Sequence, residues 1–394
     1  MSEWKEIPLS KTTKFIVDNR GKTAPTELTG IPLIATNCIS NNNLYPIYEN
    51  LRYVSSDTYE TWFRSHPQPG DIILTLKGSQ NGAVCLVPNP VDFVIAQDMV
   101  ALRVDENVID RLFLFATLRS PEVQAQIKNL DVSGVIPHLK KSDFDKLLLP
   151  YPDRKVQESI GQIYISLSNK IDLLHRQNAT LEKMAETLFR QWFVEEAKEE
   201  WENGTLDDIL SVKGGTTPST SEPDYWNGTI HWTSPRDITN LNGIYLFDTE
   251  RKITELGLSK ISSGLLPKAT LLMSSRAPVG VLAFAEIPLA INQGYIAILD
   301  NKGVSKEFIY LWLKTNIDVV HSFSNGSTFM EISKSAFKTL QLQIPPKKIL
   351  DDFQIVVKPM FDKIKSNQTQ IRTLTTLRDT LLPKLMSGEL RVKI

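Results

Sequence analysis

The sequence predicts an α/β protein built from two tandem mixed α/β domains, each followed by a long helix. Three observations indicate this fold class. The chain has 394 residues, more than one ordinary domain of about 150 residues. Its second half repeats the pattern of its first half, and both halves end in a long apolar heptad pattern. Its 44 basic and 45 acidic side chains give a formal charge of -1, so any site for a polyanion must be local.

The internal repeat is clearest around the two long helices. A shift of 193 residues aligns Lys170 with Lys363 and the apolar positions of the first helix with those of the second. The same shift aligns Pro152 with Pro345, so the strand-to-helix junction is duplicated. Farther upstream the shift becomes 199 and aligns GDIILTLKGSQNGAV with ATLLMSSRAPVGV. Repeated patterns of this kind predict two copies of one structural unit.

Each domain is expected to combine short strands with a few helices. The β-rich runs are DIILTL, AVCLV and VALRV in the first half and TLLMS, GVLAFA and YIAIL in the second. Helical patterns occupy RLFLFATLRSPEVQAQIK and KEFIYLWLKTNIDVVHSF. The charged run EEAKEEWENGT, residues 195–205, breaks at Asn203-Gly204, and we interpret it as the linker between the halves. The predicted boundaries are 1–152, 153–198, 199–345 and 346–394 for domain, helix, domain and helix.

Both long helices carry one apolar side with heptad spacing, here called the seam. The alternative is that each seam packs on its own domain. We favour pairing in a coiled coil because each pattern spans about four heptads, longer than a typical domain helix. About 35 residues would form a rod roughly 50 Å long. Asn178 lies within the first seam, and Asn367 and Arg378 interrupt the second. The seam residues are Leu167, Leu174, Leu181, Leu188, Trp192 and Phe193, then Ile364, Ile371, Leu374, Leu381 and Leu385.

The sequence contains no convincing catalytic or metal-binding motif. The RGKT stretch at Arg20 lacks the leading glycine of a phosphate-binding loop, and none of the five histidines has a second ligand at metal-binding spacing. There is no G-x-S-x-G, no G-x-G-x-x-G and no Asn-Pro-Pro-aromatic motif. A nuclease pattern can be placed on Pro223-Asp224 with Glu250-Arg251-Lys252, but so loose a pattern arises by chance. We therefore predict no catalytic residue and no metal site.

Polar loop residues remain as candidates for reading bases or gripping phosphate. Arg suits guanine, Asn and Gln suit adenine, and Lys or hydroxyls suit phosphate. The loops KGSQNG and SSRAPVG occupy equivalent places after a strand yet differ in almost every polar residue, as two readers of different sequences would. The candidates are Lys22, Thr23, Asn37, Asn41, Lys77, Ser79, Gln80 and Asn81, then Lys213, Thr216, Thr217, Arg236, Ser274, Ser275, Arg276, Asn325 and Ser327.

The chain resembles the specificity (S) subunit of type I restriction-modification systems over essentially its full length. The matching segments are LFRQWFVEE after the first helix, LLPKLMSGEL at the end, and the strand-to-helix junctions at 149–157 and 344–354. The resemblance implies that the domains are target-recognition domains, each reading one half of an interrupted DNA target. It also implies that the long helices are antiparallel spacer helices, the family's central and C-terminal conserved regions, related by a pseudo-twofold internal repeat. Their length would set the number of unread base pairs.

The resemblance further implies partners that carry the chemistry. These are double-stranded DNA, two methylation subunits that bind S-adenosylmethionine, and two motor-nuclease restriction subunits, with ATP and Mg also expected on partner subunits. The helix seams, including Leu188 to Phe193 and Leu381 to Leu385, would also be docking surfaces. No cofactor is expected on this chain itself. Partners that enclose the duplex would supply the phosphate contacts that a neutral chain lacks.

Other readings and the location of the protein follow from the remaining residues. A non-catalytic adapter with duplicated protein-binding domains is the main alternative, and a fused nuclease or methyltransferase is a third. Cys38 and Cys85, the only cysteines, are expected to be reduced core residues. No signal-peptide pattern begins the sequence and no apolar run is long enough to span a membrane, so we expect a cytoplasmic protein.

Overall fold

The computed structural model describes residues 4–19, 22–131, 136–299, 302–324 and 330–392. The chain divides into two compact units. Unit 1 contains the residues up to Leu174 and those from Gln370 onward, and unit 2 contains His175–Thr369. Each unit therefore contains one domain together with parts of both long helices.

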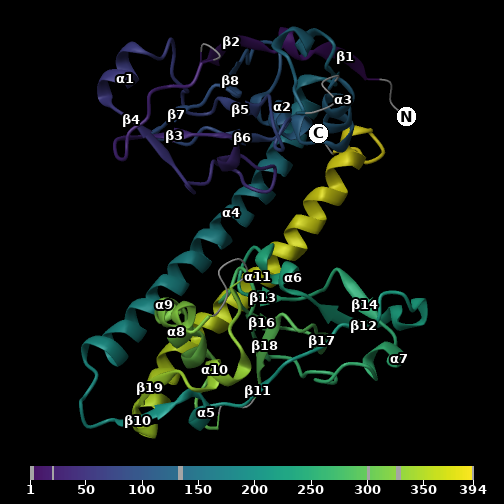
Figure 1. Ribbon diagram of the computed structural model, residues 1–394. Coiled ribbons are helices and arrows are strands. Elements are labelled where there is room, and N and C mark those ends of the chain that lie inside the picture. The colour runs from purple at the N-terminus through teal and green to yellow at the C-terminus, as the bar shows by residue number, and fades with distance from the viewer. Residues whose placement is uncertain (1–3, 20–21, 132–135, 300–301, 325–329, 393–394) are drawn as a thin grey trace. The chain divides into compact units, whose positions relative to one another are not determined.

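Unit 1 contains three small sheets (Figure 1). A two-stranded antiparallel sheet joins β1 (Lys5–Pro8) to β9 (Leu148–Tyr151). The main sheet is antiparallel, in the order β2 (Thr13–Asp18), β8 (Met99–Val104), β5 (Ile72–Thr75), β6 (Val84–Leu86). The third sheet has the order β4 (Arg52–Val54), β3 (Ile31–Ile34), β7 (Val94–Ile95), with β3 and β7 parallel. The helical segments before α4 are η1 (Leu9–Lys11), η2 (Thr36–Cys38), α1 (Ser56–Thr61), α2 (Arg111–Leu118), α3 (Pro121–Asn129) and η3 (Lys141–Asp145).

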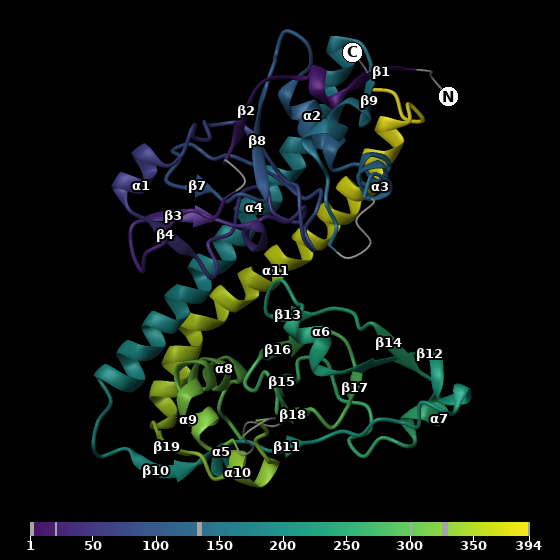
Figure 2. The ribbon, with the colours of Figure 1, turned by 45° about the horizontal axis from the view of Figure 1, so that its top comes forward.

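Unit 2 repeats this arrangement (Figure 2). Its two-stranded sheet pairs β10 (Glu202–Thr205) with β19 (Gln341–Ile344). Its main sheet has the order β11 (Val212–Lys213), β18 (Tyr295–Ile298), β15 (Leu271–Ser274), β16 (Leu282–Ala285), β13 (Tyr245–Leu246). Its third sheet has the order β14 (Arg251–Ile253), β12 (Trp226–Thr233), β17 (Leu289–Ile291). The short helices are α5 (Leu206–Ile209), η5 (Pro223–Tyr225), α6 (Pro235–Thr239), α7 (Glu255–Leu258), α8 (Lys306–Thr315), α9 (Ile317–Ser322) and α10 (Lys334–Lys338).

Strand order shows that the two domains are copies of one scaffold. The main sheet of unit 2 follows the order of that of unit 1 and adds β13 at one edge, paired parallel to β16. The three-stranded sheets also match, since β12 pairs antiparallel with β14 and parallel with β17, as β3 does with β4 and β7. In both figures this smaller sheet of unit 2 lies on the side of the main sheet away from α8 and α9. The predicted strands and helical patterns are thereby confirmed.

The two long helices are α4 (Arg154–Arg190), continued by a π-helical turn η4 (Gln191–Glu195), and α11 (Lys347–Met386). They contact each other within both units. In unit 1, Ile171 and Leu174 of α4 form an apolar cluster with Ile371 and Leu374 of α11. In unit 2, Phe189 of α4 packs on α11, close to the start of that helix. In unit 2, Asn178 contacts Asn367 and the later Phe189 contacts the earlier Phe353, so the two helices run in opposite directions there. In unit 1, Tyr164 contacts Arg378, before the apolar cluster in α4 and after it in α11, so the direction is again antiparallel.

The ends of the long helices enter the domain cores. In unit 2, Phe189 is 1% exposed and Phe353 is 0% exposed, and both belong to the main apolar core. In unit 1, Leu382, Leu385 and Met386 of α11 are buried in the core formed with α2 and the main sheet. Each seam therefore packs both on the other helix and on a domain. Both interpretations of the seam, pairing between the helices and packing on a domain, are therefore confirmed.

The predicted linker is shorter than its charge pattern indicated. Residues 202–205 form β10 and pair with β19, and Trp201 is buried with its ring 6.1 Å from that of Phe193. Glu202 and Asn203 are exposed and polar as in a loop, but an edge strand needs only backbone partners on one side. Cys38 and Cys85 are free and buried, as expected.

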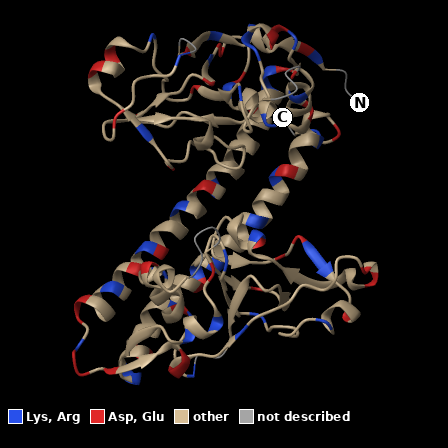
Figure 3. Ribbon diagram, viewed as in Figure 1, with Lys and Arg blue, Asp and Glu red and all other residues tan. Residues whose placement is uncertain are grey.

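Charges of both signs are interspersed along α4 and α11, while β14 stands out as a basic strand (Figure 3). Several charged side chains of α11 form pairs four residues apart, such as Lys347 with Asp351 at 3.1 Å. Within the described ranges, no helix has both the length and the hydropathy of a membrane-spanning segment.

Candidate nucleic-acid interface

Both domains place a polar loop directly after an inner strand of the main sheet, β5 in unit 1 and β15 in unit 2. The loop after β5 leads to Gly82 and the loop after β15 leads to Gly280, and these glycines have φ values of +85° and +88°. This backbone conformation is unfavourable for residues with a Cβ, so glycine allows the same tight return of the chain in both units. The side chains in the two loops nevertheless differ, as the sequence comparison indicated.

In unit 1 several of the predicted residues lie exposed on loops. Lys22 and Thr23 follow β2, and the hydroxyl of Thr23 accepts a hydrogen bond from Gln97 at 3.2 Å. Lys77 lies beyond β5 in a backbone bridge with His138, which places its side chain at the surface. Two further candidates in the same loop, Ser79 and Gln80, are also exposed. These side chains are available for contacts with a ligand.

The predicted asparagines of unit 1 are used mainly by the fold. The Oδ1 atom of Asn41 accepts the backbone N–H of Val84 at 2.9 Å, which ties its loop to β6. The Oδ1 atom of Asn81 accepts the backbone N–H of Leu139 at 3.2 Å. Asn37 is exposed, and its amide donates to a backbone carbonyl at 3.0 Å. Asn41 and Asn81 therefore have structural partners that a sequence pattern does not reveal.

In unit 2, Lys213 at the end of β11 and the residues that follow it contact neighbouring loops. Lys213 donates to the carbonyl of residue 263 at 3.3 Å, and Thr216 donates to that of residue 260 at 3.1 Å. Thr217 is exposed and donates to Gln293 at 2.7 Å. These contacts fix the orientation of the segment, and they leave Thr217 and Lys213 at its surface.

Ser274 and Ser275, two further candidates, are buried rather than exposed on the loop. They are 0% and 3% exposed, respectively. The hydroxyl of Ser274 donates to the carbonyl of Pro278 at 2.6 Å and accepts the backbone N–H of Val281 at 2.9 Å, so it closes the loop from inside. A buried hydroxyl with both partners satisfied cannot reach a duplex. The candidates Asn325 and Ser327 lie outside the described residues.

The two predicted arginines of unit 2 are exposed and lie beside carboxylates. Arg276 contacts Glu331 at 3.1 Å, and each side chain is 47% exposed. Arg236, in α6, lies 3.8 Å from Glu250 and is 73% exposed. Surface pairs of this kind contribute little to stability. Both guanidinium groups therefore remain accessible at the surface.

A further basic residue escaped the sequence prediction. The guanidinium of Arg251 in β14 lies 3.4 Å from the ring centroid of Trp226 and 5.4 Å from that of Trp232. Cation–π contacts hold such a group at the surface in a defined position. The sequence placed Arg251 in the chance nuclease pattern. Among the described residues, no group of three or more His, Cys, Asp or Glu side chains could hold a metal ion.

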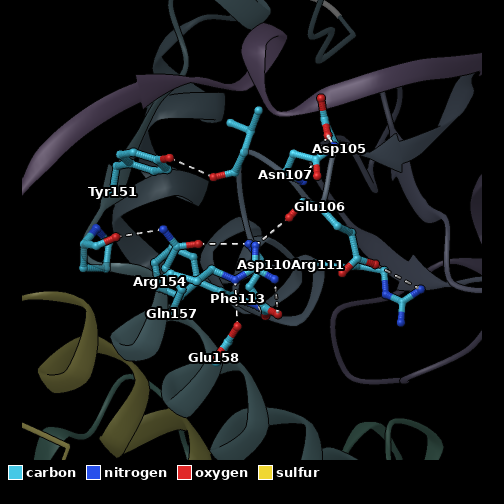
Figure 4. A network of polar contacts seen from close by, with 12 residues as sticks. Asp105, Glu106, Asn107, Asp110, Arg111, Phe113, Tyr151, Arg154, Gln157 and Glu158 are labelled. Atoms are coloured by element: carbon cyan, nitrogen blue, oxygen red, sulfur yellow. Dashed lines mark hydrogen bonds and ion pairs between the residues drawn. The ribbon is translucent and has the colours of Figure 1, made fainter. Parts of the chain in front are cut away.

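The junction between β9 and α4 is a network of polar contacts in unit 1 (Figure 4). Arg154, the first residue of α4, contacts Glu158 at 2.9 Å and Asp110 at 3.6 Å. Gln157 is 1% exposed and accepts the backbone N–H of Asp110 at 2.9 Å. The hydroxyl of Tyr151 donates to a backbone carbonyl in the loop before α2 at 2.8 Å. This network anchors the start of α4 to the domain that precedes it.

In unit 2, α4 is held by charged contacts with α8. Glu182 of α4 contacts both Tyr310 and Lys314, and Glu186 lies 2.7 Å from Lys314. Burial raises the pKa of Tyr310, and the nearby charge of Glu182 raises it further. Burial opposes the charged form of Lys314, but its contacts with the two glutamates outweigh this and raise its pKa. The lysine therefore stays protonated and fixes α4 on the domain.

Two copies of one scaffold with different polar loops define a class of protein with tandem recognition domains. The family model for the type I restriction modification DNA specificity domain matches residues 7–183 and 198–376. The chain belongs to this family and carries two copies of its domain.

Relatives of this chain include specificity subunits of type I restriction enzymes. The specificity subunit of the type I restriction enzyme MjaIX from Methanocaldococcus jannaschii is 35% identical over 187 residues, 47% of this chain and 43% of that protein. That of HindI from Haemophilus influenzae is 24% identical over 469 aligned positions, 99% of this chain and all of that protein. The crystal structure of the corresponding subunit from M. genitalium has a TM-score of 0.60 at 16% identity and covers all of this chain and 97% of its own. This last similarity concerns the fold.

Proposed function

We propose that this chain is the DNA-recognition subunit of a type I restriction-modification enzyme and reads a bipartite target, with one domain for each half. The observation that carries the proposal is the duplicated scaffold with different loops at equivalent places. Identical loops would read a symmetric target, whereas different loops read two different half-sites. The chain itself is non-catalytic in this proposal, and the bound partners perform methylation and cleavage.

Base reading is assigned to the exposed side chains on the loops. Arg276 and Arg236 in unit 2 and Lys77, Ser79 and Gln80 in unit 1 are the strongest candidates. Lys22, Thr23, Asn37, Lys213 and Thr217 would add phosphate or base contacts, and we add Arg251 to the predicted set. Arginine pairs with guanine through two hydrogen bonds, and each such pair discriminates by about 1–3 kcal/mol.

The long helices are proposed to set the spacing between the half-sites. As spacer helices related by a pseudo-twofold repeat, α4 and α11 would separate the domains by a length that the number of heptads determines. The antiparallel contacts within each unit and the anchoring of α4 through Arg154 and Gln157 support this role. Because these contacts fix the start of α4 to its domain, a change in the length of the helix would move the domain by the same amount.

Removal of matched heptads tests the spacing. Residues 170–176 of α4 and 369–375 of α11 face each other in the antiparallel pair, and deletion of both leaves the flanking pairing unchanged and spares Met184 and Leu377. The deletion shortens the helices by about 10.5 Å, which corresponds to roughly three base pairs at 3.4 Å each. Genome-wide mapping of N6-methyladenine should show both half-sites unchanged and the gap shorter. Methylation with the original gap would disprove the spacing role.

We further propose that two methylation subunits bind this chain, one at each of two equivalent surfaces on the long helices. An apolar hollow of about 600 Å³ on α4 is lined by Met184 and Leu188, and Met184 is 48% exposed. The repeat places Leu377, 44% exposed, at the position in α11 that Met184 has in α4. Exposed apolar residues at duplicated positions fit two copies of one partner. Two restriction subunits would complete the assembly.

The partner surfaces can be tested one at a time. Met184→Glu should remove one methylation subunit from the complex, Leu377→Glu the other, and the double variant both. Ile355→Glu, on an exposed position of α11 that the repeat does not duplicate in this way, is the matched control. Native mass spectrometry of the assembled complex counts the subunits. If the double variant still binds two methylation subunits, the docking surfaces lie elsewhere.

Cofactors and location follow from the same proposal. S-adenosylmethionine, ATP and Mg would be bound by the partner subunits, and the complex would act on double-stranded DNA in the cytoplasm. Binding of the chain to DNA in the presence of methylation subunits should weaken steeply with salt, because phosphate contacts release counterions. Salt-insensitive binding would instead favour a protein-binding adapter.

A further inference from the structure

One polar layer interrupts the apolar seam between α4 and α11. Asn367 is 0% exposed, and its side-chain amide donates to the Oδ1 atom of Asn178 at 2.9 Å. It also lies 3.4 Å from the Oε1 atom of Gln177. The Oδ1 atom of Asn367 has no hydrogen-bond partner among the described residues. Asn367 is therefore buried and only partly satisfied, while Asn178 is half-buried, and this layer stabilises the pair less than an apolar layer would.

The next layer along the seam is apolar. One turn before Asn178 in α4 stands Leu174, and one turn after Asn367 in α11 stands Ile371. Leu174 and Ile371 are 1% and 8% exposed and belong to one apolar cluster. Two adjacent layers of the seam thus have opposite character, one with two asparagines and one with two aliphatic residues.

The internal repeat relates these two layers to each other. The shift of 193 residues places Asn178 of α4 at the position of Ile371 in α11, and Leu174 at the position of Asn367. Each helix therefore has one asparagine and one aliphatic residue at these two places, but in opposite order. Only a pair formed by one α4 and one α11 brings both asparagines into the same layer.

We propose that the Asn178–Asn367 layer selects pairing of α4 with α11 of the same chain over pairing with the same helix of a second copy. If α4 paired with the α4 of another copy in the same antiparallel register, Asn178 of each copy would face Leu174 of the other. If α11 paired with another α11, Asn367 would face Ile371. Both arrangements place each asparagine opposite an aliphatic side chain, so its amide loses its partner on the facing helix, which is unfavourable and most so for the buried Asn367. A single polar position is known to select partner and register in coiled coils in this way.

The test uses three variants of the full chain. Asn178→Ile with Asn367→Leu replaces each asparagine by the residue that the repeat has at that place, so the whole seam becomes apolar. The fourfold variant adds Leu174→Asn and Ile371→Asn, which moves the polar pair to the equivalent layer. Asn178→Ile alone leaves Asn367 buried opposite an apolar side chain. Leu174→Ile is the control, because it alters the seam without changing its polarity.

Sedimentation velocity at increasing micromolar concentrations gives the oligomeric state. We expect the wild type, the control and the fourfold variant to remain monomeric and the double variant to form dimers that increase with concentration. The double variant should melt at or above the temperature of the wild type, whereas Asn178→Ile alone should lower the Tm by about 2–8 °C. A domain-swapped dimer, in which α4 of each chain pairs with α11 of the other, keeps the asparagine pair and would therefore also form in the wild type. A dimer that only the double variant forms must then contain α4–α4 or α11–α11 pairs.

Two results would overturn the proposal. One is a double variant that is as monomeric as the wild type at every concentration. The other is a fourfold variant that dimerises as strongly as the double variant, because relocation of the polar pair would then restore no selectivity.

Discussion

The two ends of the long-helix pair enter their domains through different side chains. In unit 2 the contact is aromatic: Phe353 of α11 lies with its ring centroid 6.0 Å from that of Phe189 and 4.8 Å from that of Phe193, both from α4 and its π-helical continuation. In unit 1 the corresponding end of α11 is aliphatic, and Arg378 lies 5.8 Å from the ring of Tyr164. The repeat thus preserves strand order and helix direction but not the side chains that fill the core.

The start of each long helix differs in the same way. In unit 1, a Cβ on Gly161 would lie 2.6 Å from the backbone nitrogen of Phe113, so α4 can approach α2 this closely only because the residue is glycine. The equivalent residue of α11 is Gln354, which donates to the buried Glu307 of α8 at 3.0 Å. One junction uses close backbone packing and the other a polar side-chain contact. A shared fold therefore tolerates two solutions to one packing problem.

The largest expected effect contrasts the two cores. Phe353→Ala should reduce the free energy of unfolding by about 3–5 kcal/mol, because it removes a fully buried ring. Ile160→Ala, the equivalent position in unit 1 and 1% exposed, should cost about 2–5 kcal/mol. Chemical denaturation measures both, and Ile355→Ala, 72% exposed, is the control with a change of no more than about 0.5 kcal/mol. Equal small losses at both buried sites would show that the helix ends are not part of the cores.

The next contrast concerns the two helix junctions. Gly161→Ala should destabilise unit 1 by about 1–3 kcal/mol, since the new methyl group meets backbone that cannot move aside easily. Gln354→Ala should destabilise unit 2 by about 1–3 kcal/mol, because it leaves the Glu307 carboxylate without this partner. Gln354→Glu adds a negative charge beside Glu307 and should be worse than alanine. Thermal unfolding measures the stability of the three variants. An unchanged stability of Gly161→Ala would contradict the comparison of the two junctions.

A comparison of the loops predicts a change in specificity rather than stability. Arg276→Ala should relax recognition in the second half-site by about 1–3 kcal/mol and leave the first half-site unchanged. Glu331→Ala, which frees Arg276 from its partner at 3.1 Å, should preserve the recognised base. Methylation of a library of DNA targets by the assembled enzyme measures both. Relaxation of the first half-site by Arg276→Ala would place this arginine outside the second reader.

The smallest effect is a pH dependence that belongs to unit 1. Burial lowers the pKa of His66, whose ring stacks on Tyr59 with centroids 4.0 Å apart. Because the folded pKa is the lower one, the stabilising effect of neutral His66 is present above the unfolded pKa of about 6.5 and is lost as the pH falls below it. The Tm of the His66→Gln variant should therefore fall less between pH 7 and pH 5 than the Tm of the wild type. An identical pH profile would assign the acid sensitivity to other groups.

Sequence reasoning predicted the framework better than the site. The strands around DIILTL and TLLMS and both long helices were predictable because period-2 and heptad patterns are local and repeat at a constant shift. Asn41 and Ser274 were predicted as readers but bond within their own domain. Arg251 was placed in a chance motif, although the structure holds it on Trp226. The polarity of a residue can be read from the sequence, but the partner that satisfies it cannot.

The sequence by itself determined the duplication, the two heptad seams, the balance of charge and the differences between equivalent loops, because each of these is a property of residue order. Only the tertiary structure decided that residues 202–205 pair as a strand, that Asn178 meets Asn367, and which polar side chains remain exposed. These features depend on segments that are far apart along the chain. Burial and hydrogen bonding arise from such long-range contacts, and no local pattern contains them.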